Sequence, residues 1–375
     1  MSFSNHDETQ VLLLQGGGAL GAYQGGVFEK LHERGFRPDY VAGISIGAIN
    51  SALIVGNRPE DRVERLHEFW QLVSSGNPLA GLFAATSVPS WLRLPFNKAS
   101  ANETMFMGIP GFFSPRMPAP MFQWPGTDAA ISFYDTAPLR DTLLRLVDFD
   151  RLNSGEVRLA VGAVDVESGN MTYFDTAEQT LGPDHIMASG SLPPGFPPVR
   201  IGDRHYWDGG IVSNTPLQYV FEHHDRERDF AVFQVDLFNA RGRMPETIFD
   251  IENREKDIRF SSRTRLLTDH AAAMHRLRMA MQRLYEKLPE ELRDDPDTQM
   301  LLNASHAGRV TIAHLIYAQS SFEREYKDYE FSRLSVEDRW RAGAADVDAT
   351  LDGKAWKNRN RNPDKLTIID CHRDH

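Results

Sequence analysis

The chain has 375 residues, 41% of them hydrophobic and 25% charged, and its formal net charge at pH 7 is −11. This composition is typical of a folded globular protein with a sizeable core, and the acidic excess argues against nucleic acid as a partner and against electrostatic docking on anionic lipid. No apolar run reaches the roughly 18 residues of a membrane-spanning helix, and the polar N-terminus and single cysteine (Cys371) indicate a cytoplasmic protein without an intrachain disulfide or cysteine-based zinc site.

The first 75 residues alternate between predicted strands and helices. Val11–Leu14 is a short apolar run typical of a buried strand, and the apolar residues of Ala19–Arg34 recur at helical spacing. Tyr40–Gly43 predicts a second buried strand, followed by helices at Gly47–Val55 and Asp61–Val73. Alternation of this kind indicates βαβ units and a largely parallel sheet.

Residues 78–134 differ in composition from the rest of the chain. They contain ten aromatic residues, eight prolines and four methionines, but only five charged residues. Because proline at this density opposes long regular elements, we expect an irregular apolar segment. Such a segment forms a lid or the wall of an apolar pocket, or else it packs on the sheet as ordinary core.

Further strands are predicted after residue 135. Arg158–Val166 and Phe230–Leu237 are apolar runs of strand length. Val199–Ile201 and Arg204–Trp207 flank a Gly-Asp pair, which predicts a hairpin. Val310–Tyr317 predicts one more strand.

The C-terminal part of the chain is mostly helical in character. Residues 251–287 are charged and carry an apolar stripe, which predicts one long amphipathic helix. Ser335, with Asp338 three residues later, predicts the N-cap of another helix. The tail from Lys354 onward is polar.

The first predicted strand leads directly into a glycine-rich loop. Gly16–Gly21 fits G-x-G-x-x-G, the dinucleotide-binding pattern, but that reading requires an acidic residue at the end of the second strand. Asp39 stands before that strand and Ser45 stands at its end, which disfavours a dinucleotide. The exposed N–H groups of such a loop bind an anion, either a phosphate or an oxyanion formed during a reaction; the alternative is a simple tight turn.

A second motif stands at the end of the second predicted strand. Gly43-Ile44-Ser45-Ile46-Gly47 fits G-x-S-x-G between a strand and a helix, the arrangement of a nucleophile elbow. The simpler interpretation is that Ser45 is a helix N-cap. Because parallel strands end at the same edge of a sheet, we expect the two loops to lie side by side. A serine beside a group of backbone N–H donors is suited to acyl transfer.

A nucleophilic serine needs a general base, and two candidates stand close together in the sequence. His205 and Asp208 lie at the end of the same predicted strand, on opposite faces if the strand continues through both. Asp208 is followed by Gly209 and Gly210, so its carboxylate is predicted on a tight turn, where it would take the serine proton directly. An ordinary Asp-Gly turn is the alternative.

Four motifs in order resemble those of the patatin-like phospholipase family. Its glycine-rich oxyanion loop, G-x-S-x-G motif and D-G-[AG] motif correspond here to Gly16–Gly21, Gly43–Gly47 and Asp208–Gly210. Residues 188–198 are similar to the family's A-S-x-x-x-P-x-x-F-x-P segment, which lies shortly before the aspartate. The resemblance covers residues 9–240.

The resemblance implies a three-layer α/β/α fold with a mostly parallel central sheet. Residues 9–240 would be the catalytic domain, with 78–134 as a lid or acyl-pocket insertion. Residues 241–375 would be a mostly helical C-terminal extension, as in some bacterial members, with no role that the resemblance identifies.

The resemblance also implies a chemistry. Ser45 would be the nucleophile, Asp208 its base, and the backbone N–H groups of Gly16, Gly17 and Gly18 the oxyanion hole. The substrate would be a lipid carboxylic ester, cleaved through an acyl-enzyme without any metal or organic cofactor, and the protein would touch a membrane or lipid inclusion peripherally.

The sequence differs from the family pattern at one position, and two alternative functions remain open. Many family members carry Lys or Arg where this chain has Leu20, so a cation for a phospholipid headgroup is missing and neutral acyl esters remain open. An acyltransferase using the same site is one rival. The other is a catalytically inactive protein that binds lipid surfaces or acts as a scaffold, which the long helix at 251–287 and the unassigned C-terminal region support.

Overall fold

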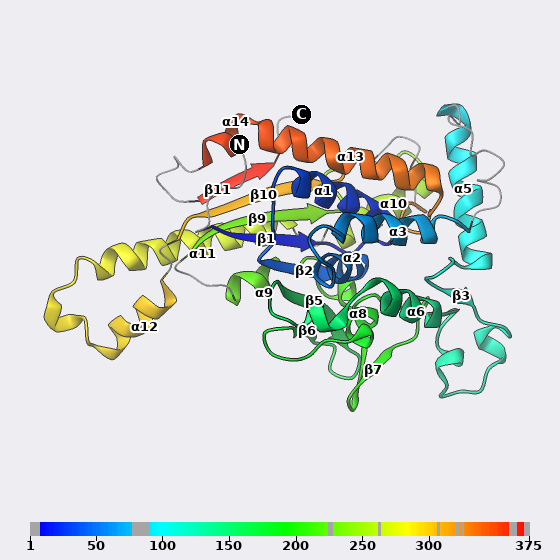
Figure 1. Cartoon of the computed structure of the whole chain (residues 1–375), viewed down its shortest axis with the longest axis horizontal. Helices are drawn as coiled ribbons and strands as arrows, with labels where there is room; N and C mark the ends of the chain where they lie inside the picture. Colours follow the sequence, from blue (N-terminus) through cyan, green and yellow to red (C-terminus); the bar gives the residue numbers. More distant parts are fainter. Residues whose placement is uncertain are drawn as a thin grey trace.

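The computed structural model describes residues 8–76, 90–223, 228–261, 264–305, 308–319, 323, 326–359 and 366–370. A nine-stranded sheet runs through the described residues (Figure 1). In spatial order its strands are β11 (Leu366–Asp370), β10 (Val310–Ile316), β9 (Asp229–Asp236), β1 (Glu8–Leu14), β2 (Tyr40–Ile44), β5 (Arg158–Asp165), β8 (Arg204–Asp208) and β7 (Val199–Ile201), with β6 (Met171–Asp175) paired to β5. From β11 to β5 all neighbouring strands are parallel, whereas β6, β7 and β8 are antiparallel. The predicted largely parallel sheet and the 199–207 hairpin are confirmed.

Helices connect the strands and cover the sheet. The α-helices of the described residues are α1 (Ala22–Glu33), α2 (Ile46–Val55), α3 (Arg62–Val73), α5 (Ser90–Met107), α6 (Ala137–Leu146), α7 (Phe149–Leu152), α8 (Pro183–Ser189), α9 (Leu217–Glu222), α10 (Ile248–Phe260), α11 (Thr264–Tyr285), α12 (Pro296–Ala304), α13 (Arg333–Asp352) and α14 (Lys354–Lys357). Short 3-10 turns are η1 (Gly18–Gly21), η2 (Pro120–Phe122), η3 (Asp128–Ala130), η4 (Gly209–Ile211) and η5 (Glu290–Leu292). None of the helices in the described residues has both the length and the apolar content needed to cross a membrane.

The two faces of the sheet bury two separate apolar cores, as the alternation of side chains along a strand requires. Leu12 and Leu14 of β1 point into the larger core, which α1, α2, α3 and α13 cover. Val11 and Leu13 point into the smaller core, which α9 and α11 cover. Figure 1 shows α1 and α13 above the strands. The α/β/α layering predicted from the resemblance is therefore present.

The C-terminal region takes part in this core. β10 pairs with β9 and carries β11 on its other edge, so both strands extend the sheet that β1 begins. α13 packs along α1. The region is mostly helical, as predicted, but its strands share a sheet with the N-terminal elements, and the proposed boundary at residue 240 stays a prediction.

The segment from 78 to 134 is more regular than its proline content predicts. Residues 77–89 lie outside the described residues, but Ser90–Met107 forms an 18-residue helix with Pro95 inside it. The prediction of no long element is wrong here because the other prolines of this segment stand outside the helix. Beyond the helix, the chain is irregular apart from a short pairing of β3 (Ser114–Pro115) with β4 (Tyr134–Asp135).

Two predicted helix boundaries need correction. The single helix predicted for residues 251–287 is two helices, α10 and α11, and α10 ends where the Phe260 carbonyl accepts hydrogen bonds from the side chains of Gln15 and Asn214. The N-cap of α13 is Ser332, whose side chain accepts the Ser335 N–H, so Ser335 itself lies inside the helix. In both cases the boundary coincides with a side-chain hydrogen bond that apolar periodicity does not report.

Candidate active site

The turn from β2 to α2 holds Ser45 in a strained conformation. Ser45 has φ 56° and ψ −124°, and it is the only non-glycine residue with positive φ in the described part of the chain. A side chain at Gly47 would clash with the Leu14 carbonyl, so the glycine lets the turn pack against the end of β1. Ser45 occupies the N-cap position of α2, but its side chain caps no N–H group. Strain of this kind is typical of a functional turn.

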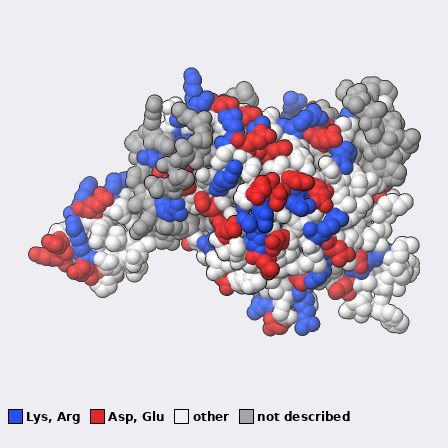
Figure 2. Space-filling view, in the orientation of Figure 1, with Lys and Arg blue, Asp and Glu red and all other residues white. Residues whose placement is uncertain are grey.

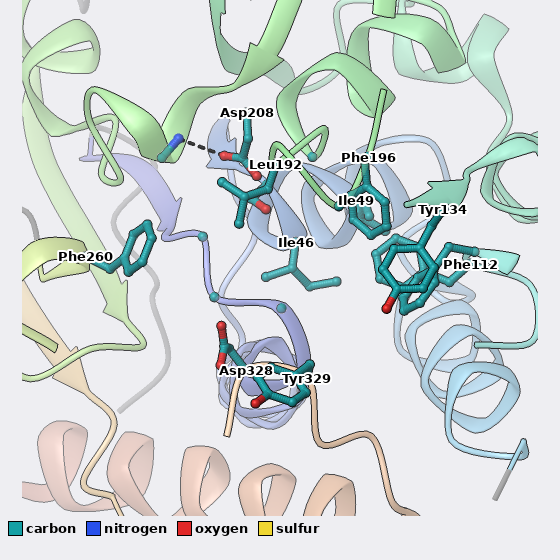
Figure 3. Close-up of a pocket in the computed structure, with 18 of the residues that line it drawn as sticks. Ile46, Ile49, Phe112, Tyr134, Leu192, Phe196, Asp208, Phe260, Asp328 and Tyr329 are labelled. Atoms are coloured by element: carbon teal, nitrogen blue, oxygen red, sulfur yellow. Dashed lines mark hydrogen bonds between the residues drawn. The ribbon is translucent and has the colours of Figure 1, made fainter. Parts of the chain in front are cut away.

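Asp208 lies beside Ser45, although 162 residues separate them in the sequence. Its side chain at the end of β8 is buried, and its Oδ1 accepts the Gly210 N–H at 2.7 Å (Figure 3). Burial raises the pKa of Asp208 to about 7, and hydrogen bonds from the Ser45 side chain and the Gly210 N–H oppose that rise. The carboxyl group therefore changes its charge near neutral pH.

His205, the other candidate base, lies elsewhere. Its side chain is partly exposed, and its Nδ1 lies 3.1 Å from Oε1 of Glu167. Alternation along β8 turns His205 away from the side that Asp208 occupies, as expected. No histidine of the described residues lines the cavity around Ser45.

The glycine loop runs from β1 into η1 next to Ser45. Gly16, Gly17 and Gly18 line the same cavity as Ser45 and Asp208. Gly18 has φ 55°, and a side chain there would collide with the Asp328 carbonyl. Within the described residues, the N–H groups of Gly17 and Gly18 donate to no acceptor.

The remaining motif glycines serve packing. Gly43 and Gly47 flank the elbow, and a side chain at Gly21 would press on Ile46 of α2. Gly209 packs against the Gly162 carbonyl, whereas Gly210 lines the cavity and donates to Asp208. The sequence motifs are thus partly chemical and partly steric.

Three buried side chains hold the site in place, and of these only Ser189 belongs to a sequence motif. Ser189 accepts the Ser45 N–H at 3.0 Å and donates to the Gly162 carbonyl at 2.6 Å, which ties the elbow to β5. Asn214 donates to the carbonyls of Gly16 at 2.9 Å and Phe260 at 3.0 Å. Gln15 accepts the Leu237 N–H at 2.6 Å. Neither Asn214 nor Gln15 belongs to a motif, so no signal in the sequence pointed to them.

The cavity in front of Ser45 has a volume of about 380 Å³ and mostly apolar walls. Figure 3 shows Asp208 on one side, Asp328 and Tyr329 on the opposite side, and the rings of Phe112, Tyr134 and Phe196 at a third. Residues 78–134, the segment rich in proline and aromatic residues, thus supply part of the cavity wall. Phe112 of this segment also packs in the buried core. The C-terminal region supplies another part, which the sequence did not predict because these residues lie far from the motifs.

Charge in the cavity is entirely acidic. Asp208 and Asp328 are the charged side chains among its described lining residues. Leu20, at the position where many family members carry a cation, is fully buried and does not line the cavity. Lys256, which does not line the cavity, lies 2.8 Å from the Asp328 carboxylate.

Together, the fold and these residues define a class: α/β proteins that present a strained serine elbow beside a glycine loop at the carboxyl edge of parallel strands. The model of the patatin-like phospholipase family matches residues 12–221, and a second model, described as patatin phospholipase, matches residues 258–363. The chain belongs to the patatin-like phospholipase family, whose members are lipid hydrolases.

Individual relatives are more distant. The uncharacterized protein YqhO of Bacillus subtilis is 26% identical over 243 residues, which cover 60% of this chain and 70% of that protein. Among solved structures, VipD from Legionella pneumophila matches with a TM-score of 0.36 and 15% identity, over 97% of this chain and 72% of VipD. ExoU of Pseudomonas aeruginosa, solved in complex with SpcU, matches with a TM-score of 0.30 and 15% identity, over 80% of this chain and 68% of that one.

Proposed function

We propose that this protein is a serine acyl hydrolase that cleaves carboxylic esters of lipids through Ser45 and Asp208. The observation that carries the proposal is the buried Asp208 carboxyl beside the strained Ser45, in a cavity that also holds the free N–H groups of the glycine loop. A base, a nucleophile and oxyanion donors in one apolar cavity are the requirements for acyl transfer.

The reaction has two steps. Ionised Asp208 accepts the Ser45 proton as Oγ attacks the ester carbonyl, and the N–H groups of the loop stabilise the oxyanion. The alcohol leaves with the proton that Asp208 held, and the acyl group stays on Ser45. Water then attacks the acyl-enzyme and gives a proton to Asp208. Asp208 returns that proton to Ser45 Oγ as the bond between Oγ and the acyl carbon breaks, so the fatty acid leaves and Ser45 and ionised Asp208 are regenerated.

The lining of the cavity favours uncharged acyl groups over anionic headgroups. Its walls are mostly apolar, and its described lining residues include no cation for a phosphate, since the charged ones are Asp208 and Asp328 and Asp328 already pairs with Lys256. We therefore infer that the cavity holds the acyl chain and that a charged headgroup, where one is present, stays outside.

The test is labelling with a fluorophosphonate probe, followed by hydrolysis of a soluble short-chain ester. The native chain should be labelled and active, and Ser45→Ala should lose both properties while its circular dichroism spectrum is unchanged. Ser213→Ala, a change outside the cavity lining, is the matched control. Hydrolysis by a folded Ser45→Ala chain would contradict the proposal.

A further inference from the structure

The surface formed by the last turn of α5 and the segment that follows it exposes an unusual number of large apolar side chains. Seven such side chains of the described residues are more than 70% exposed, and six of them lie between residues 106 and 124. These six are Phe106, Met107, Met117, Met121, Phe122 and Trp124, and we call them the apolar rim. A soluble protein rarely exposes so many of its apolar side chains together without a partner for them.

The apolar rim begins beside the cavity in front of Ser45. Met105, next to Phe106, lines the cavity and is also half exposed, so the cavity reaches the surface there. Tyr134 lines the same part of the cavity and donates from its hydroxyl to the Met105 carbonyl at 2.9 Å. The β3–β4 pairing joins the two ends of the loop that carries Met117 to Trp124. An acyl chain that enters the cavity past Met105 would therefore come from the phase that contacts the rim.

The rim carries almost no charge. Between residues 105 and 133 the only charged side chains are Arg116 and Asp128. Arg116 is engaged inside the protein, because its Nε donates to Ser132 Oγ at 2.9 Å and its Nη1 lies 3.6 Å from Asp135. In Figure 2 this surface, at the lower right, is almost entirely white. Without a free cation, the rim offers nothing to an anionic surface.

We propose that the apolar rim inserts into the surface of a lipid phase without net negative charge, such as a phosphatidylcholine bilayer, and that the cavity opens into that phase. The proposal rests on the proposed function, since it places the ester substrate in the layer that the rim enters. Aromatic and methionine side chains suit this role, because they bury large areas and tryptophan tolerates the polar boundary.

The test measures binding and turnover separately. Ser45→Ala protein, which cannot consume the lipid, is sedimented with phosphatidylcholine vesicles at low and high salt. We expect binding that salt does not weaken. The affinity for vesicles should fall by about tenfold or more in Phe122→Ser/Trp124→Ser, because the transfer of each ring from water to lipid contributes a free energy equivalent to about tenfold in affinity. Neither residue lines the cavity, so the same double substitution in the active chain should leave hydrolysis of a soluble ester unchanged.

A matched pair of single substitutions controls for nonspecific hydrophobic binding to the vesicles. Met121→Ser removes a rim methionine, and Met300→Ser removes one of similar exposure on α12, at the opposite end of the molecule (Figure 1). Only Met121→Ser should weaken binding. No vesicle binding, equal effects of the two substitutions, binding restricted to anionic vesicles, or a rim buried in a dimer without lipid would each overturn the proposal. Soluble-ester hydrolysis that persists in those cases would leave the proposed function standing.

Discussion

The charge of one buried carboxyl group controls the proposed chemistry at the residue scale. Asp208 has a pKa of about 7 because burial disfavours its ionised form more than its two hydrogen bonds favour it. A general base works only when ionised, so the active fraction rises with pH through that value. Groups tuned in this way are typical of catalytic positions.

The pH dependence of hydrolysis follows directly. We expect kcat/KM for a soluble ester to rise with pH, with an apparent pKa near 7, and to level off above it. In Asp208→Asn, turnover should fall by about 10²–10⁴-fold and the residual activity should lack this inflection. A stopped assay between pH 5 and 9 measures both. An unchanged profile in Asp208→Asn would point to another base.

Ser189 should position the nucleophile without touching the substrate. Its hydroxyl accepts the Ser45 N–H and donates to Gly162, so Ser189→Ala leaves a strained turn with an unpaired N–H. We expect kcat and the rate of fluorophosphonate labelling to fall by about 10–100-fold, with KM little changed. Ser191→Ala is the control, because that buried hydroxyl bonds only the Met187 carbonyl. Equal losses in both variants would mean a general packing effect.

At the scale of elements, α13 joins the C-terminal region to the glycine loop. Its buried Arg339 donates to the carbonyls of Ala19 at 3.1 Å, Lys327 at 2.9 Å and Glu330 at 2.9 Å, and to the Glu323 carboxylate at 2.9 Å. Asp328 and Tyr329, which line the cavity, lie within this clamped segment. The helix therefore fixes one wall of the cavity relative to the oxyanion donors.

Removing that clamp should cost much stability. Arg339→Met leaves Glu323 buried without its cation, so we expect a loss of about 3–5 kcal/mol in the free energy of unfolding. Arg341→Met, on the same helix, removes a largely exposed pair with Asp338 and should cost no more than about 1 kcal/mol. Urea denaturation compares the two. Equal destabilisation would contradict the assigned role of Arg339.

For the whole molecule, the question is whether the region after residue 240 can be removed. β9 lies in the interior of the sheet, and without β10 it would become an exposed edge of buried apolar residues. Part of the cavity wall would also be lost.

We therefore expect a chain ending at residue 240 to aggregate or to expose apolar surface. Binding of the dye ANS and limited proteolysis, with the full chain as reference, measure this. A stable, monomeric 1–240 fragment would instead support the predicted domain boundary.

Local sequence alone determined the strand–helix alternation and the strained serine elbow. Apolar periodicity reports which residues face a core, and glycines mark places where backbone must approach backbone, as at Gly18 and Gly47. Both signals lie within a few residues, so the first two βα units and the loops at their ends were predictable. The nearness of Asp208 to Ser45 was predictable only through the family resemblance.

Only the tertiary structure decided what surrounds those loops. Asn214, Arg339 and Asp328 come from distant segments, and each makes one hydrogen bond to residues 16–19. Such contacts leave no periodic pattern in the sequence. The pKa of Asp208 depends on burial, which is a property of the whole packed core. The apolar rim could not be recognised beforehand either, because the composition of residues 78–134 predicted a lid or pocket wall, or else ordinary core, and only the fold shows which of these side chains are exposed.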